Sequence, residues 1–268
     1  MKVLVIPDVH SRKFWRQSIT ENIDKVDKII FLGDYLDPYG EEIQMAPELM
    51  ECKYFGDWEG NLNMLHDIVS LKNNEPGKYI LLCGNHTMSY ISSKFEAASR
   101  TDYKNWEKYH KFFSENLNLF NLVYTENDCI FSHAGIVQGW AETVWSSLIH
   151  KSGEEMFSIM EIAKFLETVS LKDIKVIKLL SHIPYRRGGD YPYGSCEWAD
   201  IYEHIDMSKT TLGHIEPKGE DGIFQIFGHT QLVNRPIITD KWACLDCRKG
   251  FIFDTETHSI EDGSDNSL

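Results

Sequence analysis

The sequence predicts an α/β fold whose strands end at one shared ligand site. Short apolar runs alternate with stretches of helical spacing, and five of these runs lead directly into Asp, Asn or His. A short apolar run bounded by turn residues is typical of a buried strand. In open α/β sheets, sites form beyond the carboxyl ends of the strands. The five strand ends therefore indicate one place where polar side chains gather.

The clearest strand end is the pair Gly33-Asp34, which follows the second apolar run. The glycine allows a sharp turn, so Asp34 is placed directly at the end of the strand. After the first run, alternation puts Asp8 and His10 on the same side of an extended chain, where both can bind one ion. The other three runs end in Asn85 with His86, in His133, and in His229. Divalent metals take ligands of these types.

The rest of the chain is expected to form helices and further strands. Helical spacing is found in residues 12–22, 57–71, 95–116 and 138–180, a hairpin is expected over 119–131, and strands follow from residue 223. The aromatic stripe of 95–116 is expected to lie in the core. Because 138–180 has no cluster of ligand types, it is most simply a helical insertion. We expect one domain over 1–258 and a polar, acidic tail over 259–268 that frays.

The composition indicates a soluble, cytoplasmic protein. No apolar run in the 268 residues reaches the length that a membrane span needs, and the N-terminal run is too short for the core of a signal peptide. The net charge of −14 disfavours broad binding to nucleic acid, which needs a basic face. A small anionic substrate remains compatible with this charge, because a bound cation can reverse the local field.

Six side chains at the strand ends are candidate metal ligands: Asp8, His10, Asp34, Asn85, His133 and His229. A tetrahedral zinc takes four ligands, so this set suits two ions that share a carboxylate. Asp34 comes from the middle of the set and is the expected bridge. Two metals roughly 3.5–4 Å apart can hold an attacking hydroxide and clamp both ends of an in-line displacement. This chemistry fits the hydrolysis of phosphate esters.

Hydrolysis also needs a proton for the leaving group, and His86 is the candidate general acid. It follows a predicted ligand, so we expect it near the metals but not bound to them. Asp37 is the candidate carboxylate that orients His86 and stabilises its charged form. The glycine-rich loop 182–198 carries Arg186 and Arg187, and arginine can bind phosphate with two hydrogen bonds. A solvated surface loop is the alternative for this stretch.

Five motifs resemble, in the same order, those of the calcineurin-like metallophosphoesterases. They are Asp8-Val9-His10, Gly33-Asp34-Tyr35-Leu36-Asp37, Gly84-Asn85-His86, His133-Ala134-Gly135 and Gly228-His229-Thr230. The resemblance extends from residue 1 to about 254 and is nearest the branch of Ser/Thr protein phosphatases and diadenosine tetraphosphatases. It implies a four-layer αββα sandwich of two mixed β-sheets with two divalent ions, commonly Mn, Fe or Zn.

The resemblance also assigns the ligands to the two ions. It implies that the first ion is held by Asp8 and His10, that the second is held by Asn85, His133 and His229, and that Asp34 binds both. Many family members have a second histidine in the last motif, where this chain has Gln231. The first ion is then expected to have three protein ligands, with water or Gln231 completing its shell.

Two further departures concern the substrate. In the protein-phosphatase branch, Arg and Gly follow the second aspartate, but Pro38 and Tyr39 follow it here. The phosphate-binding arginine of that branch is therefore missing, and Arg12, Arg186 or Arg187 would have to replace it. The acidic residue that follows the G-N-H motif in that branch is Thr87 here. These changes leave the reaction class intact and weaken the case for a phosphoprotein substrate.

The expected function is a dinuclear metal-dependent phosphoesterase that uses a metal-bridging hydroxide. A phosphomonoesterase acting on a phosphoprotein or a small phosphate is slightly favoured. A nucleotide pyrophosphatase or phosphodiesterase, of the diadenosine-polyphosphate or cyclic-nucleotide type, is the alternative enzyme. The alternative outside enzymes is a catalytically silent scaffold with the same fold, and the presence of all six ligands and His86 argues against it.

Overall fold

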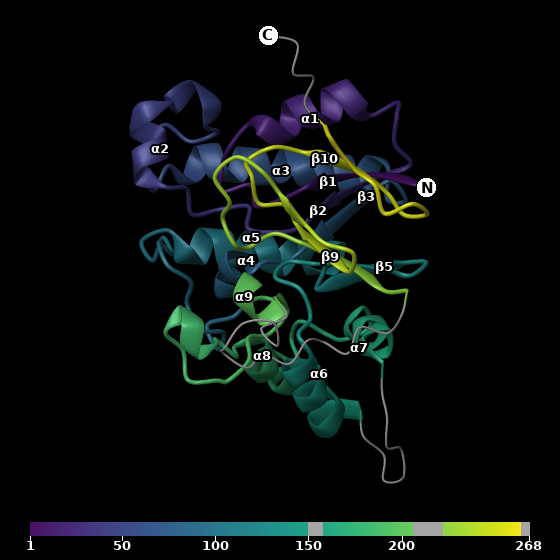
Figure 1. The fold of residues 1–268 in the computed structure, drawn as a ribbon. Helices are drawn as coiled ribbons and strands as arrows, with labels where there is room; N and C mark the ends of the chain where they lie inside the picture. The colour runs from purple at the N-terminus through teal and green to yellow at the C-terminus, as the bar shows by residue number, and fades with distance from the viewer. Residues whose placement is uncertain (150–157, 206–221, 264–268) are drawn as a thin grey trace.

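Two β-sheets form the centre of the computed structural model, which describes residues 1–149, 158–205 and 222–263 (Figure 1). The first sheet is built from β1 (Lys2–Ile6), β2 (Lys28–Phe31), β3 (Tyr79–Leu82), β4 (Phe120–Asn121), β10 (Phe251–Asp254) and β11 (Ile260–Asp262). Its strand order is β11-β10-β1-β2-β3-β4. The strands from β1 to β4 are parallel to their neighbours, whereas β10 pairs antiparallel with β1 and β11 antiparallel with β10.

The second sheet is built from β5 (Val123–Glu126), β6 (Cys129–Ser132), β7 (Phe224–Phe227), β8 (Ile237–Ile238) and β9 (Trp242–Cys244). Its strand order is β5-β6-β7-β9-β8. Strands β6, β7 and β9 are parallel, while β5 and β8 are antiparallel to their neighbours. Both sheets are therefore mixed, as the sequence predicts.

Alternate residues of the central strands face different layers. Along β1, Val3 and Val5 pack in the core between the two sheets, together with residues of the second sheet such as Phe131. Leu4 and Ile6 point the other way and belong to the core that the helices cover. Because both faces are buried, these strands read as unbroken apolar runs. The arrangement is the predicted four-layer αββα sandwich.

Helices α1 (Phe14–Asn22) and α3 (Trp58–Asn74) contact the first sheet at β1 and β3. The start of α3 is fixed by Asp57, whose side chain accepts a hydrogen bond of 3.1 Å from the backbone N–H of Gly60. Further helical segments follow the strands of the first sheet. They are α2 (Gly40–Met45), the 3₁₀ turn Pro47–Leu49, α4 (Asn85–Ile91), α5 (Trp106–Asn116) and the 3₁₀ turn Leu117–Leu119.

The predicted helical insertion lies between β6 and β7. Over the predicted range 138–180 it contains α6 (Gln138–Val144), the π-helical turn Trp145–Ile149, α7 (Ile159–Leu166) and α8 (Ile174–Leu180). Beyond that range, and before β7, come the 3₁₀ turn Tyr185–Arg187 and α9 (Ile201–His204). Figure 1 shows these helices at the end of the molecule opposite α1 and α3. The Trp140 indole N–H donates to the Leu179 carbonyl at 3.0 Å and joins α6 to α8. Of the helices in the described ranges, none is long and apolar enough to cross a membrane.

Two expected elements differ from the structure. The helix expected over 95–116 begins only at Trp106, because the preceding residues form turns and Arg100 has a positive φ of 61°. The hairpin strand expected at 119–124 is split. Phe120–Asn121 pairs with β3 in the first sheet, whereas Val123–Glu126 pairs with β6 in the second, so the chain changes sheets at Leu122. A short apolar run indicates that its residues are buried, but it does not indicate which of the two sheets they join.

The aromatic stripe is in the core as expected, since Tyr109, Phe112 and Phe113 are buried. The segment expected to fray contains β11, which pairs antiparallel with β10 and thus extends the first sheet. Its last residues, 264–268, lie outside the described ranges.

Candidate metal centre

The six predicted ligands lie at one edge of the two sheets, because the strands that precede them are parallel within each sheet. In the first sheet they follow β1 (Asp8 and His10), β2 (Asp34) and β3 (Asn85), and in the second they follow β6 (His133) and β7 (His229). All are buried except His229, which is half-buried. The polypeptide therefore brings ligands from five separate strands to one place.

Glycines beside the ligands leave room for the two carboxylates. A Cβ atom at Gly84 would lie 2.2 Å from Asp34 Oδ1, and one at Gly228 would lie 2.2 Å from Asp8 Oδ1. Gly33 has a φ of +112°, and a Cβ there would lie 2.5 Å from the Cys83 carbonyl oxygen. Positive φ angles also occur at non-glycine residues of this region, namely His10, Ser11, Asp34, Asp37 and His229. Such strain is typical of functional sites.

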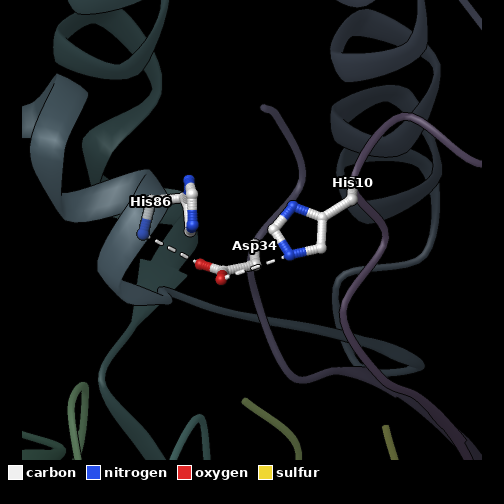
Figure 2. Close-up of side chains that lie close together, drawn as sticks. All are labelled: His10, Asp34 and His86. Carbon is white, nitrogen blue, oxygen red and sulfur yellow. Dashed lines mark hydrogen bonds and ion pairs between the residues drawn. The ribbon is translucent and has the colours of Figure 1, made fainter. Parts of the chain in front are cut away.

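The first group of side chains consists of His10, Asp34 and His86 (Figure 2). His10 Nε2 lies 3.7 Å from Asp34 Oδ2, and the backbone N–H of His86 donates to Asp34 Oδ1 at 2.9 Å. His10 Nδ1 is 2.7 Å from the Leu36 carbonyl oxygen, to which it can donate. That hydrogen bond fixes the tautomer and leaves His10 Nε2 free to bind a cation.

The second group consists of Asp34, His133 and His229. His133 Nε2 lies 3.0 Å from His229 Nδ1, 3.1 Å from Asn85 Oδ1 and 3.4 Å from Asp34 Oδ2. His133 Nδ1 is 3.0 Å from the Leu32 carbonyl oxygen, so its Nε2 is again the atom left for a ligand. Asp34 belongs to both groups, as the bridging role requires.

Asp8 is held against the strand end that carries His229. Both of its carboxylate oxygens accept from the backbone N–H of His229, at 3.0 and 3.2 Å. Burial raises the pKa of Asp8, and the neighbouring charge of Asp34 adds to this effect. Two carboxylates therefore share a buried region with little water to separate them.

The charges of this region favour a cation. Burial opposes protonation of His133, but the carboxylates of Asp34 and Asp8 outweigh it and raise the pKa of His133 to about 10. Although burial acts in the other direction, the charge of His133 lowers the pKa of Asp34. Without an ion, the carboxylates are thus balanced by a proton on a histidine whose Nε2 is surrounded by acceptor atoms. Divalent ions would replace that proton, so the donor set fits a metal centre.

His86 makes the contact with Asp37 that the sequence predicts. His86 Nδ1 is 2.7 Å from Asp37 Oδ2, and the Tyr90 hydroxyl donates to Asp37 Oδ1 at 2.5 Å. Burial raises the pKa of Asp37, while its hydrogen bond with His86 acts against the rise. The rings of His86 and His10 meet edge to face, with centroids 4.9 Å apart. His86 is therefore the member of the first group that a second carboxylate, Asp37, holds through its Nδ1.

Comparison with known proteins identifies the family. The family model described as calcineurin-like phosphoesterase matches residues 1–230. The chain is a calcineurin-like phosphoesterase. It is accordingly a metal-dependent hydrolase of phosphoric esters. No curated protein sequence matches this phosphoesterase.

Solved structures support the fold of this phosphoesterase. A cold-active protein-tyrosine phosphatase from a psychrophilic Shewanella species has a TM-score of 0.54 and 14% identity, over 98% of this chain and 80% of that one. A protein serine/threonine phosphatase from Saccharomyces cerevisiae has a TM-score of 0.46 and 12% identity, over 94% of this chain and 71% of that one. The Shewanella enzyme, with its TM-score above 0.5, has the same fold as this chain.

The three arginines proposed from the sequence lie in different surroundings. Arg12 donates to the Asp8 carbonyl at 3.2 Å but is also paired with Glu42, with Nε 2.7 Å from Glu42 Oε2. Arg187 borders the second group, since its Nη2 donates to Thr230 Oγ1 at 2.7 Å. The guanidinium carbon of Arg186 lies 5.6 Å from the centre of the Tyr202 ring.

Arg100 lies next to the first group and was not singled out in the sequence. Its Nε donates to the Asp37 carbonyl at 3.2 Å, and its guanidinium carbon is 3.7 Å from the centre of the Tyr39 ring. The Tyr39 ring in turn meets the His10 ring edge to face at 5.6 Å. No sequence signal links Arg100 to the motifs, because only the tertiary fold brings it to Asp37.

A hollow of about 950 Å³ opens beside the first group. Its walls include Arg12, Tyr39, Met45, Leu49, Gln231 and Arg248. Gln231 is exposed on this wall. That Gln231 completes the shell of the first ion stays a prediction.

Two buried carboxylates near the ligands were also missed, Glu197 and Asp246. Glu197 is fully buried, and this burial raises its pKa to about 8 against the opposing charge of His133. Asp246 follows the apolar run of β9, so the rule that identified the other strand ends could have found it. In each carboxylate, one oxygen has no hydrogen-bond partner among the described residues.

The contact between Gly228 and Asp8 gives a direct test of the metal centre. We expect Gly228→Ala to push the Asp8 carboxylate away from its place and to weaken Mn²⁺ binding by at least roughly tenfold. The apo protein should unfold within a few degrees of wild type, because the added Cβ meets a side chain rather than backbone. Metal analysis after equilibrium dialysis measures the effect. Gly40→Ala is the control, since its Cβ would meet no atom within 4 Å; equal affinities in the two variants would contradict the prediction.

Proposed function

We propose that this phosphoesterase is a phosphomonoesterase with two divalent ions, Mn, Fe or Zn. The observation that carries the proposal is that one carboxylate, Asp34, belongs to both groups of ligand atoms. In this assignment Asp8 and His10 hold the first ion, Asn85, His133 and His229 hold the second, and Asp34 bridges them. When bound, the ions would supply Lewis acidity and an activated water to the phosphate ester.

Side chains of the protein then supply the proton for the leaving group and orient its donor. His86 donates a proton to the leaving-group oxygen, and Asp37 keeps its ring oriented through the bond of 2.7 Å to Nδ1. Because Nδ1 faces Asp37, Nε2 is the atom that delivers the proton. The Tyr90 hydroxyl donates a hydrogen bond to the other oxygen of Asp37, so both carboxylate oxygens are held in place.

Arg100 is proposed as the residue that binds the substrate phosphate on the side of the first ion. Tyr39 and the Asp37 carbonyl hold the guanidinium from two sides. None of the described residues accepts a hydrogen bond from its Nη2, which leaves a donor for a phosphate oxygen. Arg12 is less suited to this role because Glu42 already occupies its guanidinium.

The enzyme and the number of ions can be tested together. We expect purified protein saturated with Mn²⁺ to hold two ions per chain and to hydrolyse p-nitrophenyl phosphate faster than bis-p-nitrophenyl phosphate. Removal of the metal by a chelator should abolish turnover, and added Mn²⁺ should restore it. Faster hydrolysis of the diester would favour the nucleotide phosphodiesterase alternative. Absence of both metal and turnover would favour the catalytically silent scaffold.

The acid role of His86 predicts a dependence on the leaving group. We expect His86→Ala to keep about two ions per chain and to lower kcat for an alkyl phosphate by roughly 10²–10⁴. The loss for p-nitrophenyl phosphate should be much smaller, because p-nitrophenolate leaves without a proton. Steady-state kinetics on both substrates measure this difference. If both rates fell equally, His86 would not be the acid.

The phosphate role of Arg100 predicts a loss of substrate affinity with intact metal binding. We expect Arg100→Ala to lower kcat/KM by roughly 10–100-fold, the effect of one lost charged hydrogen bond. Arg186→Ala is the matched control and should have a much smaller effect. Competitive inhibition by inorganic phosphate measures the affinity directly. Unchanged inhibition in the Arg100 variant would exclude this residue as the phosphate ligand.

A further inference from the structure

Asp246 stands at a strand end in the same way as the proposed ligands. It comes two residues after β9, which is parallel to β7, with Phe227 opposite Cys244. Strand β7 leads into His229, and β9 leads into Asp246, so both residues emerge at the same edge of the second sheet. The backbone there is fixed by a bond of 2.8 Å from the Leu232 N–H to the Asp246 carbonyl.

The surroundings of Asp246 leave its charge unbalanced by the protein. Its side chain is buried, with 3% of the residue surface exposed, and Oδ1 has no hydrogen-bond partner among the described residues. Burial raises the pKa of Asp246, the carboxylate of Asp8 adds to the rise, and Arg12 acts against it. Arg12 is already paired with Glu42. A buried, unpaired carboxylate is unfavourable unless a cation lies nearby.

The strand end that carries Asp246 lies beside the one that holds Asp8: Cys244 Sγ is 3.3 Å from the Gly228 carbonyl oxygen, and a Cβ at Gly228 would meet Asp8 Oδ1. Asp8 is a proposed ligand of that ion, and the adjacent strand end provides Asp246. The side chain at position 231, where related sequences carry a histidine, is an exposed glutamine. We propose that Asp246 is a positioning residue of the first-ion site, whose carboxylate raises the affinity of that ion beside Asp8. This inference rests on the proposed dinuclear function and adds a residue that favours one of the two ions.

Mn²⁺ binding to the apo protein tests the proposal without reference to turnover. Equilibrium dialysis over a range of Mn²⁺ concentrations gives the number and affinity of the ions. We expect Asp246→Asn to retain one ion with wild-type affinity and to bind the other roughly 10–100-fold more weakly. Asp240→Asn removes the same formal charge from an exposed position before β9 and should leave both affinities unchanged.

Thermal unfolding of the apo proteins separates this role from a structural one. Apo Asp246→Asn should unfold at the wild-type temperature or above it, because the amide removes an unbalanced carboxyl group. The stabilisation that Mn²⁺ gives should be smaller in this variant than in wild type. A large loss of stability already present in the apo variant would overturn the proposal, because Asp246 would then be structural.

Three other results would also overturn it. Wild-type affinity for both ions in Asp246→Asn would remove Asp246 from the site and leave the proposed function intact. Loss of an ion in Gln231→Ala but not in Asp246→Asn would assign the position to Gln231. If wild-type protein bound fewer than two ions, the proposed function itself would fail, and this proposal with it.

Discussion

The structure depends on the placement of two carboxylates, Asp8 and Asp34, in one buried region. Coulomb repulsion between like charges is strong where water is excluded, so the folded chain has to provide positive charge there. In the absence of an ion, a proton on His133 provides that charge, and its Nε2 lies within hydrogen-bond distance of Asn85 Oδ1 and His229 Nδ1. The parallel strands, the glycines and the backbone strain around the site all serve to hold these carboxylates in position.

The fold and most of the candidate site follow from one rule about parallel strands. An apolar run buried on both faces is visible in sequence, and the residue after it must emerge at the ligand edge, which identified Asp34 and His133. The same rule reaches Asp246, but sequence alone does not say that the strand before it is parallel to β7. Neighbour and direction are properties of the assembled sheet. The position of Arg100 could not be predicted from the sequence, because no hydrophobic periodicity and no motif connects it with Asp37.

The departures from the usual motif are related to one another in three dimensions. Where relatives carry Arg and Gly after the second aspartate, this chain has Pro38 and Tyr39. The Tyr39 ring supports the guanidinium of Arg100 on one side and meets His10 on the other. An arginine from a distant turn thus lies against Asp37 and Tyr39, at the place where the motif departs from the usual pattern.

The pairing of β10 with β1 has a consequence for the order in which the protein is made. Strand β1 acquires one of its two neighbours only from residues 251–254, which are synthesised long after it. Strand β9, which borders β7, also comes after all of the strands that lead into the predicted ligands. During translation, the nascent chain can form the β1–β2–β3 part of its first sheet but not the complete edge at which the predicted ligands lie. That edge is complete only once β9 and β10 have been synthesised.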